Sequence, residues 1–338
     1  MKNLDSLPKV ELHRHLEGAL PLALQATLLA NMGEPVAGGV AALRGRTCVV
    51  RPMRSLNEVL ACFDLFGRML ATLEAIDQGT RAAVAQAAAE GLVYLELRFS
   101  PGFIRKWCPA GDVEIIRCVA TAAAEESALH DIHVALLVIA TRELGPEPCE
   151  AAFQAAAALQ SAGVVGVDLA GDEDRFPLST FARPLALARE AGLSITIHAG
   201  ETGNPGAVRE AVEDLGAARI GHGIAAVEDP SVAALLRERS VPLEISITSN
   251  WIVGAVPSRE AHPIRRLRDL GVPVTVNTDD PALFDVTLVD ELALAARLLD
   301  LDLDGLLQLQ LDSLSAGFAP VAVRDKARAV MMAWDAQG

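Results

Sequence analysis

The amino-acid sequence predicts an α/β fold, specifically a (β/α)8 TIM barrel with extra helices. Eight short apolar runs alternate with helix-like segments along the 338 residues, which is the order such a barrel requires. No linker or shift in composition divides the chain, so residues 1–338 are predicted to form a single barrel domain. Polar residues follow the apolar runs at their carboxyl ends, where barrels of this class carry their active sites.

The predicted strands are short and rich in Val, Ile and Leu, as expected for strands buried on both faces. They cover residues 9–12, 92–99, 132–139, 164–169, 193–197, 219–220, 241–247 and 272–276. The predicted helices cover residues 21–30, 77–90, 112–130, 147–161, 178–191, 205–215, 230–239 and 263–270, with one more that begins near Ser55 and two or three more from about 288. Residues 31–52 contain Gly and Pro and are predicted to be irregular.

The helix that begins near Ser55 shows one apolar face. Leu56, Val59, Leu60 and Phe63 follow the i, i+3, i+4, i+7 spacing of an amphipathic helix. Ser55 and Glu58 have the spacing of a capping box. Spacing alone favours core packing for this face over a lid above a ligand.

A doubly wound open sheet is the second fold that this alternation permits. Its phosphate-binding fingerprint is missing, because the sequence contains no G-x-G-x-x-G and no G-x-x-x-x-G-K-[ST]. The nucleophile elbow G-x-S-x-G is absent as well. The barrel is therefore the preferred prediction.

The composition limits the classes of partner. The formal net charge is −15, the isoelectric point is about 4.9 and the mean hydropathy is +0.31. An acidic protein of this kind is not expected to bind nucleic acid or an anionic membrane surface, and it suits neutral or cationic small molecules. The five cysteines form no C-x-x-C pair, and no secretory signal is visible, so we expect reduced thiols and a cytoplasmic protein.

The polar residues after the predicted strands gather at one end of the predicted barrel. They are His13, His15, Asp168, Gly171, Asp172, His198, Glu201, His222, Asn250, Asp279 and Asp280. His130 and His133 flank the wrong end of a strand, and His262 precedes a helix, so these three are expected to be structural.

Three imidazoles and a carboxylate without cysteine suit Zn²⁺ with an open position for water. His13 and His15 lie two residues apart on a strand and therefore point to the same face. Such a metal makes water a nucleophile near neutral pH, and nearby carboxylates and His222 could move protons. The residues themselves thus indicate hydrolytic attack on an electrophilic carbon.

Five motifs in this order resemble the adenosine deaminase family of the amidohydrolase superfamily. They are Leu7-Pro-Lys-Val-Glu-Leu-His-Arg-His-Leu-Glu-Gly18, Val167-Asp-Leu-Ala-Gly-Asp-Glu173, His198-Ala-Gly-Glu201, Arg219-Ile-Gly-His-Gly223 and Asn277-Thr-Asp-Asp-Pro281. The resemblance implies one zinc per chain, held by His13, His15, His198 and Asp279. It also implies a small purine substrate, whereas the oligomeric state stays open.

The same resemblance assigns roles to further residues. Glu201 would protonate purine N1, and His222 with Asp279 would orient and deprotonate the attacking water. Asp280 would bind N7, for which it must carry a proton because N7 is an acceptor. The backbone N–H of Gly171 would meet N3. The face of Leu56, Val59, Leu60 and Phe63 corresponds to the family's apolar gate.

Two departures from the family pattern concern the substrate. Glu17 stands where adenosine-specific members usually carry Asp at the ribose end, and Glu there is more typical of adenine and aminodeoxyfutalosine deaminases. Ser246-Ile-Thr-Ser249 stands where many members have a Cys-Pro start. The Asp-Leu-Ala-Gly-Asp-Glu motif favours a nucleoside over free adenine. Adenosine or deoxyadenosine is therefore the first expectation, with aminodeoxyfutalosine or adenine as alternatives.

Two more distant functions fit the sequence less well. Metal-dependent hydrolases of amides, lactones or phosphotriesters often bridge two metals with a lysine, and no Lys follows strand four. A barrel retained only for binding would be expected to lack a metal ligand or Glu201, and none is missing. A deaminase remains the preferred expectation.

Overall fold

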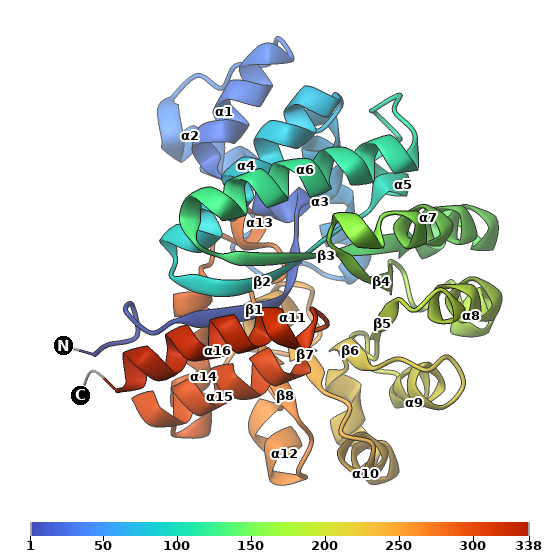
Figure 1. The fold of residues 1–338 in the computed structure, drawn as a ribbon, viewed down its shortest axis with the longest axis vertical. Coiled ribbons are helices and arrows are strands. Elements are labelled where there is room, and N and C mark those ends of the chain that lie inside the picture. Colours follow the sequence, from blue (N-terminus) through green and yellow to red (C-terminus); the bar gives the residue numbers. More distant parts are fainter. Residues whose placement is uncertain (1, 337–338) are drawn as a thin grey trace.

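The computed structural model describes residues 2–336 and contains one eight-stranded parallel sheet surrounded by helices (Figure 1). Its strands pair in chain order, from the first to the eighth. They are β1 (Lys9–His15), β2 (Leu92–Phe99), β3 (His133–Thr141), β4 (Val164–Ala170), β5 (Ser194–Ala199), β6 (Arg219–His222), β7 (Leu243–Ile245) and β8 (Val274–Val276). The predicted (β/α)8 TIM barrel with extra helices is confirmed.

The helices follow the strands along the chain and continue beyond the last one. They are α1 (Leu22–Asn31), α2 (Gly39–Thr47), α3 (Leu56–Met69), α4 (Leu73–Ala89), α5 (Pro101–Ile104), α6 (Asp112–His130), α7 (Pro146–Ala158), α8 (Ala182–Glu190), α9 (Pro205–Glu213), α10 (Pro230–Glu238), α11 (Ile247–Ile252), α12 (Ile264–Asp269), α13 (Pro281–Phe284), α14 (Leu288–Leu299), α15 (Leu303–Ala316) and α16 (Val321–Asp335). Among residues 2–336, none of them has both the length and the apolar character that crossing a membrane requires.

Local sequence explains where several of these helices begin. Asn204 and Asp229 precede prolines, and their side chains accept hydrogen bonds from the backbone N–H groups of the first helical turn. Thr72 caps α4 in the same way, five residues before the predicted start of that helix. A proline in the first turn costs no hydrogen bond, because that N–H has no partner within the helix.

Three local predictions were wrong. Residues 31–52 are not wholly irregular, because they contain α2. Ser55 is the N-cap of α3, yet its side chain forms no cap hydrogen bond. Glu58 instead accepts from the backbone N–H of Arg54 at 3.0 Å and pairs with the Arg54 side chain at 2.5 Å, so the capping box does not form. The seventh strand is shorter than predicted, since α11 begins at Ile247.

The barrel closes between β1 and the turn that follows β8. The backbone N–H of His15 donates to the carbonyl of Asp279 at 2.8 Å, and the N–H of Asp279 donates to the carbonyl of His13 at 3.0 Å. A parallel bridge joins Arg14 and Asp279. The hydrogen bonds that close the barrel therefore run through three of the residues singled out in the sequence.

Charged side chains fill part of the barrel interior, and they are all paired. Arg98 donates to Asp168 and to Glu244, each at 2.8 Å. Arg219 donates to Glu244 at 2.6 Å and pairs with Glu96. These five side chains are at most 1% exposed. Burial alone would raise the pKa of Glu244, but Arg98 and Arg219 hold it well below its ordinary value.

Candidate active site

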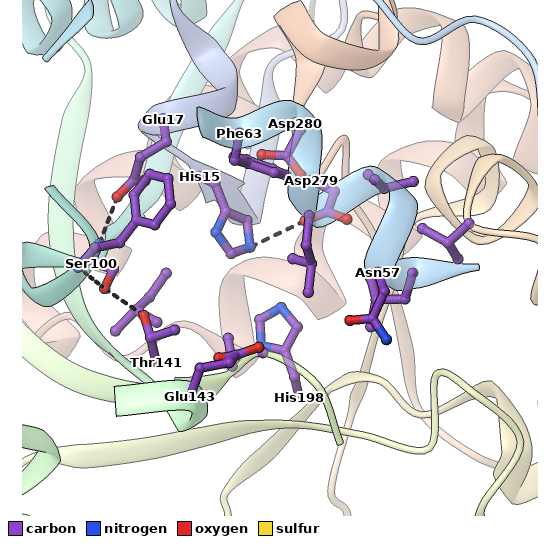
Figure 2. Close-up of a pocket in the computed structure, with 18 of the residues that line it drawn as sticks. His15, Glu17, Asn57, Phe63, Ser100, Thr141, Glu143, His198, Asp279 and Asp280 are labelled. Carbon is purple, nitrogen blue, oxygen red and sulfur yellow. Dashed lines mark hydrogen bonds and ion pairs between the residues drawn. The ribbon is translucent and has the colours of Figure 1, made fainter. Parts of the chain in front are cut away.

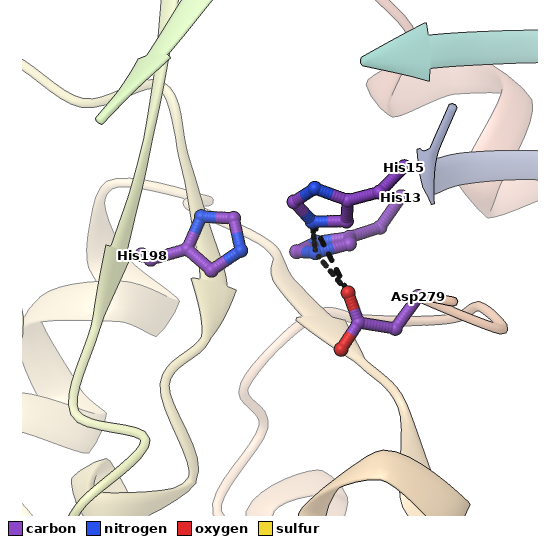
Figure 3. Close-up of side chains that lie close together, drawn as sticks. All are labelled: His13, His15, His198 and Asp279. Carbon is purple, nitrogen blue, oxygen red and sulfur yellow. Dashed lines mark hydrogen bonds and ion pairs between the residues drawn. The ribbon is translucent and has the colours of Figure 1, made fainter. Parts of the chain in front are cut away.

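Three imidazoles and one carboxylate converge at the carboxyl ends of the strands (Figure 3). His13 and His15 come from β1, His198 from β5 and Asp279 from the turn after β8. One donor atom from each lies within 4.8 Å of the other three. The Nε2 atoms of His13 and His15 are 3.2 Å apart and each is 3.1 Å from Asp279 Oδ1. We call these four residues the metal cluster.

Carboxylates behind the metal cluster fix the orientation of two rings. His13 Nδ1 lies 2.8 Å from Glu244 Oε2, and His198 Nδ1 lies 3.0 Å from Asp168 Oδ1. A carboxylate accepts from Nδ1–H, which leaves Nε2 of each ring unprotonated and able to bind a cation. Asp168 was singled out in the sequence, but Glu244 was missed. Glu244 could have been recognised as a charged residue within an apolar run, because a fully buried charge needs a partner.

The donor set of the metal cluster fits a divalent ion of the zinc type. Imidazole nitrogens and a carboxylate oxygen are donors that suit Zn²⁺ and other divalent transition metals. Ser249 Oγ donates to Asp279 Oδ2 at 2.7 Å, so the second carboxylate oxygen is also oriented. Sequence reasoning missed Ser249, which lies in the segment that departs from the family pattern.

A cavity of about 290 Å³ opens beside the metal cluster (Figure 2). Its apolar side comes from α3, where the four residues of the predicted gate all line the cavity, and from Phe103. Asn57 of α3 donates to Asp172 at 3.1 Å, which links this helix to the segment after β4. The position of the α3 face agrees with a gate, and its movement stays a prediction.

Two buried acids and a histidine face the cavity. Burial, together with the charges of Asp279 and Glu173, raises the pKa of Glu201 well above its ordinary value. His222 Nε2 lies 3.7 Å from Glu201 Oε1 and 3.8 Å from Asp279 Oδ2. Burial lowers the pKa of His222 well below its ordinary value, although Asp279 acts in the opposite direction. These shifts favour the protonated form of the Glu201 carboxyl and the neutral form of the His222 imidazole.

The Asp280 side chain packs against Gly18, where only glycine leaves it enough space. A Cβ placed on Gly18 would lie 1.9 Å from Asp280 Oδ1, a distance that no side chain could tolerate. Oδ1 has no hydrogen-bond partner within residues 2–336. Burial and the nearby carboxylates, Asp279 first, raise the pKa of Asp280 well above its ordinary value. Because Asp280 lines the cavity and has a polar atom without a partner, this side chain is suited to contact a ligand.

Glu17 and Glu143 also line the cavity. Glu17 Oε1 accepts from the backbone N–H of Ser100 at 2.8 Å, whereas Oε2 has no partner within the described residues. Burial raises the pKa of Glu17 to about 7. Glu143, which the sequence analysis missed, also lines the cavity. A Cβ on Gly171, whose φ is +113°, would meet the Glu143 carboxylate at 2.3 Å.

The remaining histidines lie outside the cavity lining. His130 pairs with Glu126 on the surface, and His133 starts β3. His262 is buried and lies 3.1 Å from the side chain of Asn250, which itself contacts His222. Asn250 and His262 therefore belong to the surroundings of the site.

The model of the family described as adenosine deaminase matches residues 8–334. The chain belongs to the adenosine deaminase family. It is 34% identical to the adenosine deaminase of Klebsiella pneumoniae (strain 342), over 93% of this chain and 94% of that protein. The sequence resemblance is thereby confirmed, and the chain is an adenosine deaminase-like aminohydrolase.

Two solved structures show the breadth of substrates among similar proteins. The N6-methyl-AMP deaminase of Arabidopsis thaliana is 29% identical, with a TM-score of 0.86 over 99% of both chains. The adenine deaminase of Arthrobacter aurescens is 27% identical, with a TM-score of 0.85 over 97% of this chain and 99% of that chain. These names include a nucleotide and a free base, so the fold and family leave the group attached to the purine undecided.

Proposed function

We propose that this chain catalyses the zinc-dependent hydrolytic deamination of a 6-aminopurine nucleoside, adenosine or deoxyadenosine, to inosine or deoxyinosine and ammonia. The observation that carries the proposal is Glu201, a buried carboxyl of raised pKa that faces a cavity beside the metal cluster. A protonated carboxyl at that place can donate to purine N1 and make C6 more electrophilic.

His13, His15, His198 and Asp279 would hold one Zn²⁺ per chain. A divalent metal supplies Lewis acidity, which makes water a nucleophile near neutral pH. His222 and Asp279 would orient the attacking water and take its proton. The distance of 3.8 Å between His222 Nε2 and Asp279 Oδ2 supports a shared target for the two side chains.

Two further groups would hold the purine edge. Asp280, protonated because its pKa is raised, would donate from its unpartnered oxygen to N7. The backbone N–H of Gly171 would donate to N3, and glycine allows the backbone to approach the ring closely. The face of α3 would cover the apolar surface of the base.

The sugar end of the cavity favours a nucleoside with a neutral 5′ group. Glu17 Oε2 is free to accept a hydrogen bond from a hydroxyl group. Glu143 adds a second carboxylate to the cavity lining, and two carboxylates would repel a 5′-phosphate. We therefore expect AMP to be a poor substrate, in contrast to the substrate named for the Arabidopsis relative.

Aminodeoxyfutalosine is the second candidate substrate, and Glu17 is the residue that favours it. A glutamate in place of the aspartate usual in adenosine-specific members is longer by one methylene and could bend away from a larger 5′ substituent. Lys106 is exposed and lines the same cavity, so it could pair with an anionic group on such a substituent. A cytoplasmic location and a single domain over residues 1–338 stay predictions.

A substrate panel tests the proposal. Product formation would be compared for adenosine, deoxyadenosine, adenine, aminodeoxyfutalosine, AMP and N6-methyl-AMP at equal enzyme concentration. We expect adenosine and deoxyadenosine to have the highest kcat/KM. A higher value for aminodeoxyfutalosine selects the second candidate, and efficient turnover of AMP contradicts the assignment of Glu17 and Glu143.

Elemental analysis tests the metal separately. We expect one zinc per chain in active protein and its loss in a His13→Ala, His15→Ala double variant. Undiminished metal in that variant would show that the metal binds elsewhere. His130→Ala is the matched control, because His130 lies on the surface and pairs only with Glu126 among the described residues.

A further inference from the structure

A chain of buried hydrogen bonds extends from His222 away from the cavity. His222 Nδ1 lies 3.1 Å from Asn250 Nδ2, and Asn250 Oδ1 lies 3.1 Å from His262 Nε2. His262 Nδ1 in turn accepts from the backbone N–H of Ile264 at 3.1 Å. The three side chains are at most 5% exposed, so water does not compete for these bonds.

The backbone N–H of Ile264 determines the direction of every bond in this chain. A backbone N–H can only donate, so His262 Nδ1 carries no proton. The single ring proton of His262 is therefore on Nε2, which donates to Asn250. The atom of Asn250 that receives this bond must be its carbonyl oxygen, which turns the amide nitrogen toward His222.

The same reasoning fixes the tautomer of His222. An amide NH₂ group can only donate, so His222 Nδ1 is the acceptor and carries no proton. The imidazole must then carry its proton on Nε2, the atom that faces Glu201 and Asp279. The tautomer of His222 follows from the backbone N–H of Ile264. It therefore does not depend on which end of the Asn250 amide is taken as oxygen.

We propose that Asn250 and His262 are positioning residues that hold His222 as the Nε2–H tautomer, so that His222 donates a hydrogen bond into the cavity instead of accepting a proton there. This inference rests on the proposed deamination and refines one of its steps. Asp279 is then the group that accepts the proton of the attacking water, while Nε2–H of His222 orients the oxygen of that water. With an unprotonated Nε2, His222 would share the role of general base with Asp279.

This chain of hydrogen bonds also accounts for His262 and Pro263, to which the proposed function gives no role. His262 lies twelve residues beyond Asn250 and contacts it across the loop between α11 and α12. Pro263 follows His262, and the N–H of Ile264 opens α12. This N–H belongs to the first turn of a helix and has no partner within that helix, so it is free to hold the ring of His262.

Nuclear magnetic resonance of the imidazole nitrogens tests the tautomer directly. The protein would be labelled with ¹⁵N-histidine and measured with and without added Zn²⁺, and the His222 signals would be assigned from their loss in His222→Gln. We expect a protonated Nε2 and an unprotonated Nδ1 in both states. A protonated Nδ1 in the zinc-loaded wild type overturns the proposal, and this readout does not depend on which substrate the enzyme uses.

Matched variants test whether Asn250 and His262 set that tautomer. A carboxylate in Asn250→Asp accepts hydrogen bonds from both neighbours, so we expect the His222 proton to move to Nδ1. We expect kcat to fall about 10²-fold or more, with KM and zinc content nearly unchanged. An Asn250→Asp variant that keeps the Nε2–H tautomer contradicts the proposal.

Two substitutions of His262 keep the test decisive if Asn250→Asp fails to fold. Gln at position 262 can still donate to the Asn250 oxygen, so His262→Gln should retain the tautomer and most of kcat. His262→Leu removes the donor and should give a mixture of His222 tautomers and a lower kcat. Equal tautomer populations in the two variants would overturn the role of His262, and His133→Gln, remote from the chain, serves as the folding control.

Discussion

The paired carboxylates of the barrel interior and the unpaired carboxyl groups of the cavity are equally buried, yet their pKa values move in opposite directions. Glu244 accepts from Arg98, Arg219 and Thr196 and contacts His13, and its pKa is lowered well below its ordinary value. Glu201 lacks a cationic side-chain partner among the described residues, and its pKa is raised. Burial is common to both, so the partners decide the charge.

This difference separates positioning from catalysis. The interior carboxylates stay ionised, and they hold the rings of His13 and His198 in orientations suited to a metal. Glu201 and Asp280 in the cavity have raised pKa values, which favour the protonated form that can donate to a ligand. One side-chain type therefore serves two purposes, and substitutions in the two regions should have different consequences.

The largest effect is expected from Glu244→Gln. Removing this charge leaves Arg98 and Arg219 without their shared partner, and breaking a buried ion pair costs about 3–5 kcal/mol. Denaturant unfolding of the zinc-loaded protein measures this loss. Glu213→Gln is the control, because Glu213 takes part in a surface ion pair worth about 1 kcal/mol or less. A loss below about 1 kcal/mol for Glu244→Gln would mean that the interior network contributes little to stability.

Glu201→Gln should have the second largest effect, and on activity. An amide cannot transfer a proton to N1, so kcat should fall about 10²-fold or more. Zinc content must be measured alongside, because His198 lies three residues away. A variant with normal zinc and a kcat within a few-fold of wild type would rule out Glu201 as the proton donor.

Glu17→Ala is expected to act on one class of substrate. A lost hydrogen bond to a charged group costs about 1.5–3 kcal/mol, so kcat/KM for the nucleoside should fall roughly 10- to 150-fold. Free adenine has no sugar to reach Glu17 and serves as the internal control. An equal loss for adenine and adenosine would place Glu17 outside the sugar end.

The smallest effect concerns the stability of Glu201→Gln in the metal-free protein. A carboxyl of raised pKa binds its proton more tightly in the folded than in the unfolded state. Wild-type stability therefore falls as pH rises from the unfolded value, about 4.3, toward the folded pKa. The variant lacks this loss, so its melting temperature should exceed that of wild type at pH 8 by on the order of a degree or two, and by less at pH 5. A lower melting temperature at pH 8 would show that the Glu201 carboxylate is compensated after all.

The sequence predicted the barrel and the residues of the metal cluster because both depend on repeated local signals. Six of the eight apolar runs were followed by the polar residues singled out, and strand ends meet in a barrel whatever their separation. The partners of those residues were harder to predict. Glu244 and Arg98 lie inside strands, and their pairing depends on register between strands that are far apart in sequence.

Local features of the structure were not predicted correctly for a different reason. The spacing of Ser55 and Glu58 matched a capping box, but Arg54 offered Glu58 a stronger, charged partner. The helix at residues 39–47 contains two glycines and has little apolar periodicity, so only its surroundings define it. Glu143 became visible as part of the cavity only through its contact with the backbone near Gly171.

Closure of the barrel at Asp279 has a consequence for synthesis of the chain on the ribosome. Leu12 N–H donates to the side chain of Asn277, which lies 265 residues further along. Translation proceeds at about 5–20 residues per second, so on the order of 10 to 50 s separate the synthesis of β1 from that of its closing partner. A nascent chain therefore exposes one edge of β1 while the later strands are still missing. The metal cluster takes its last ligand from the same late segment, so a truncated chain that ends before β8 has no complete metal cluster.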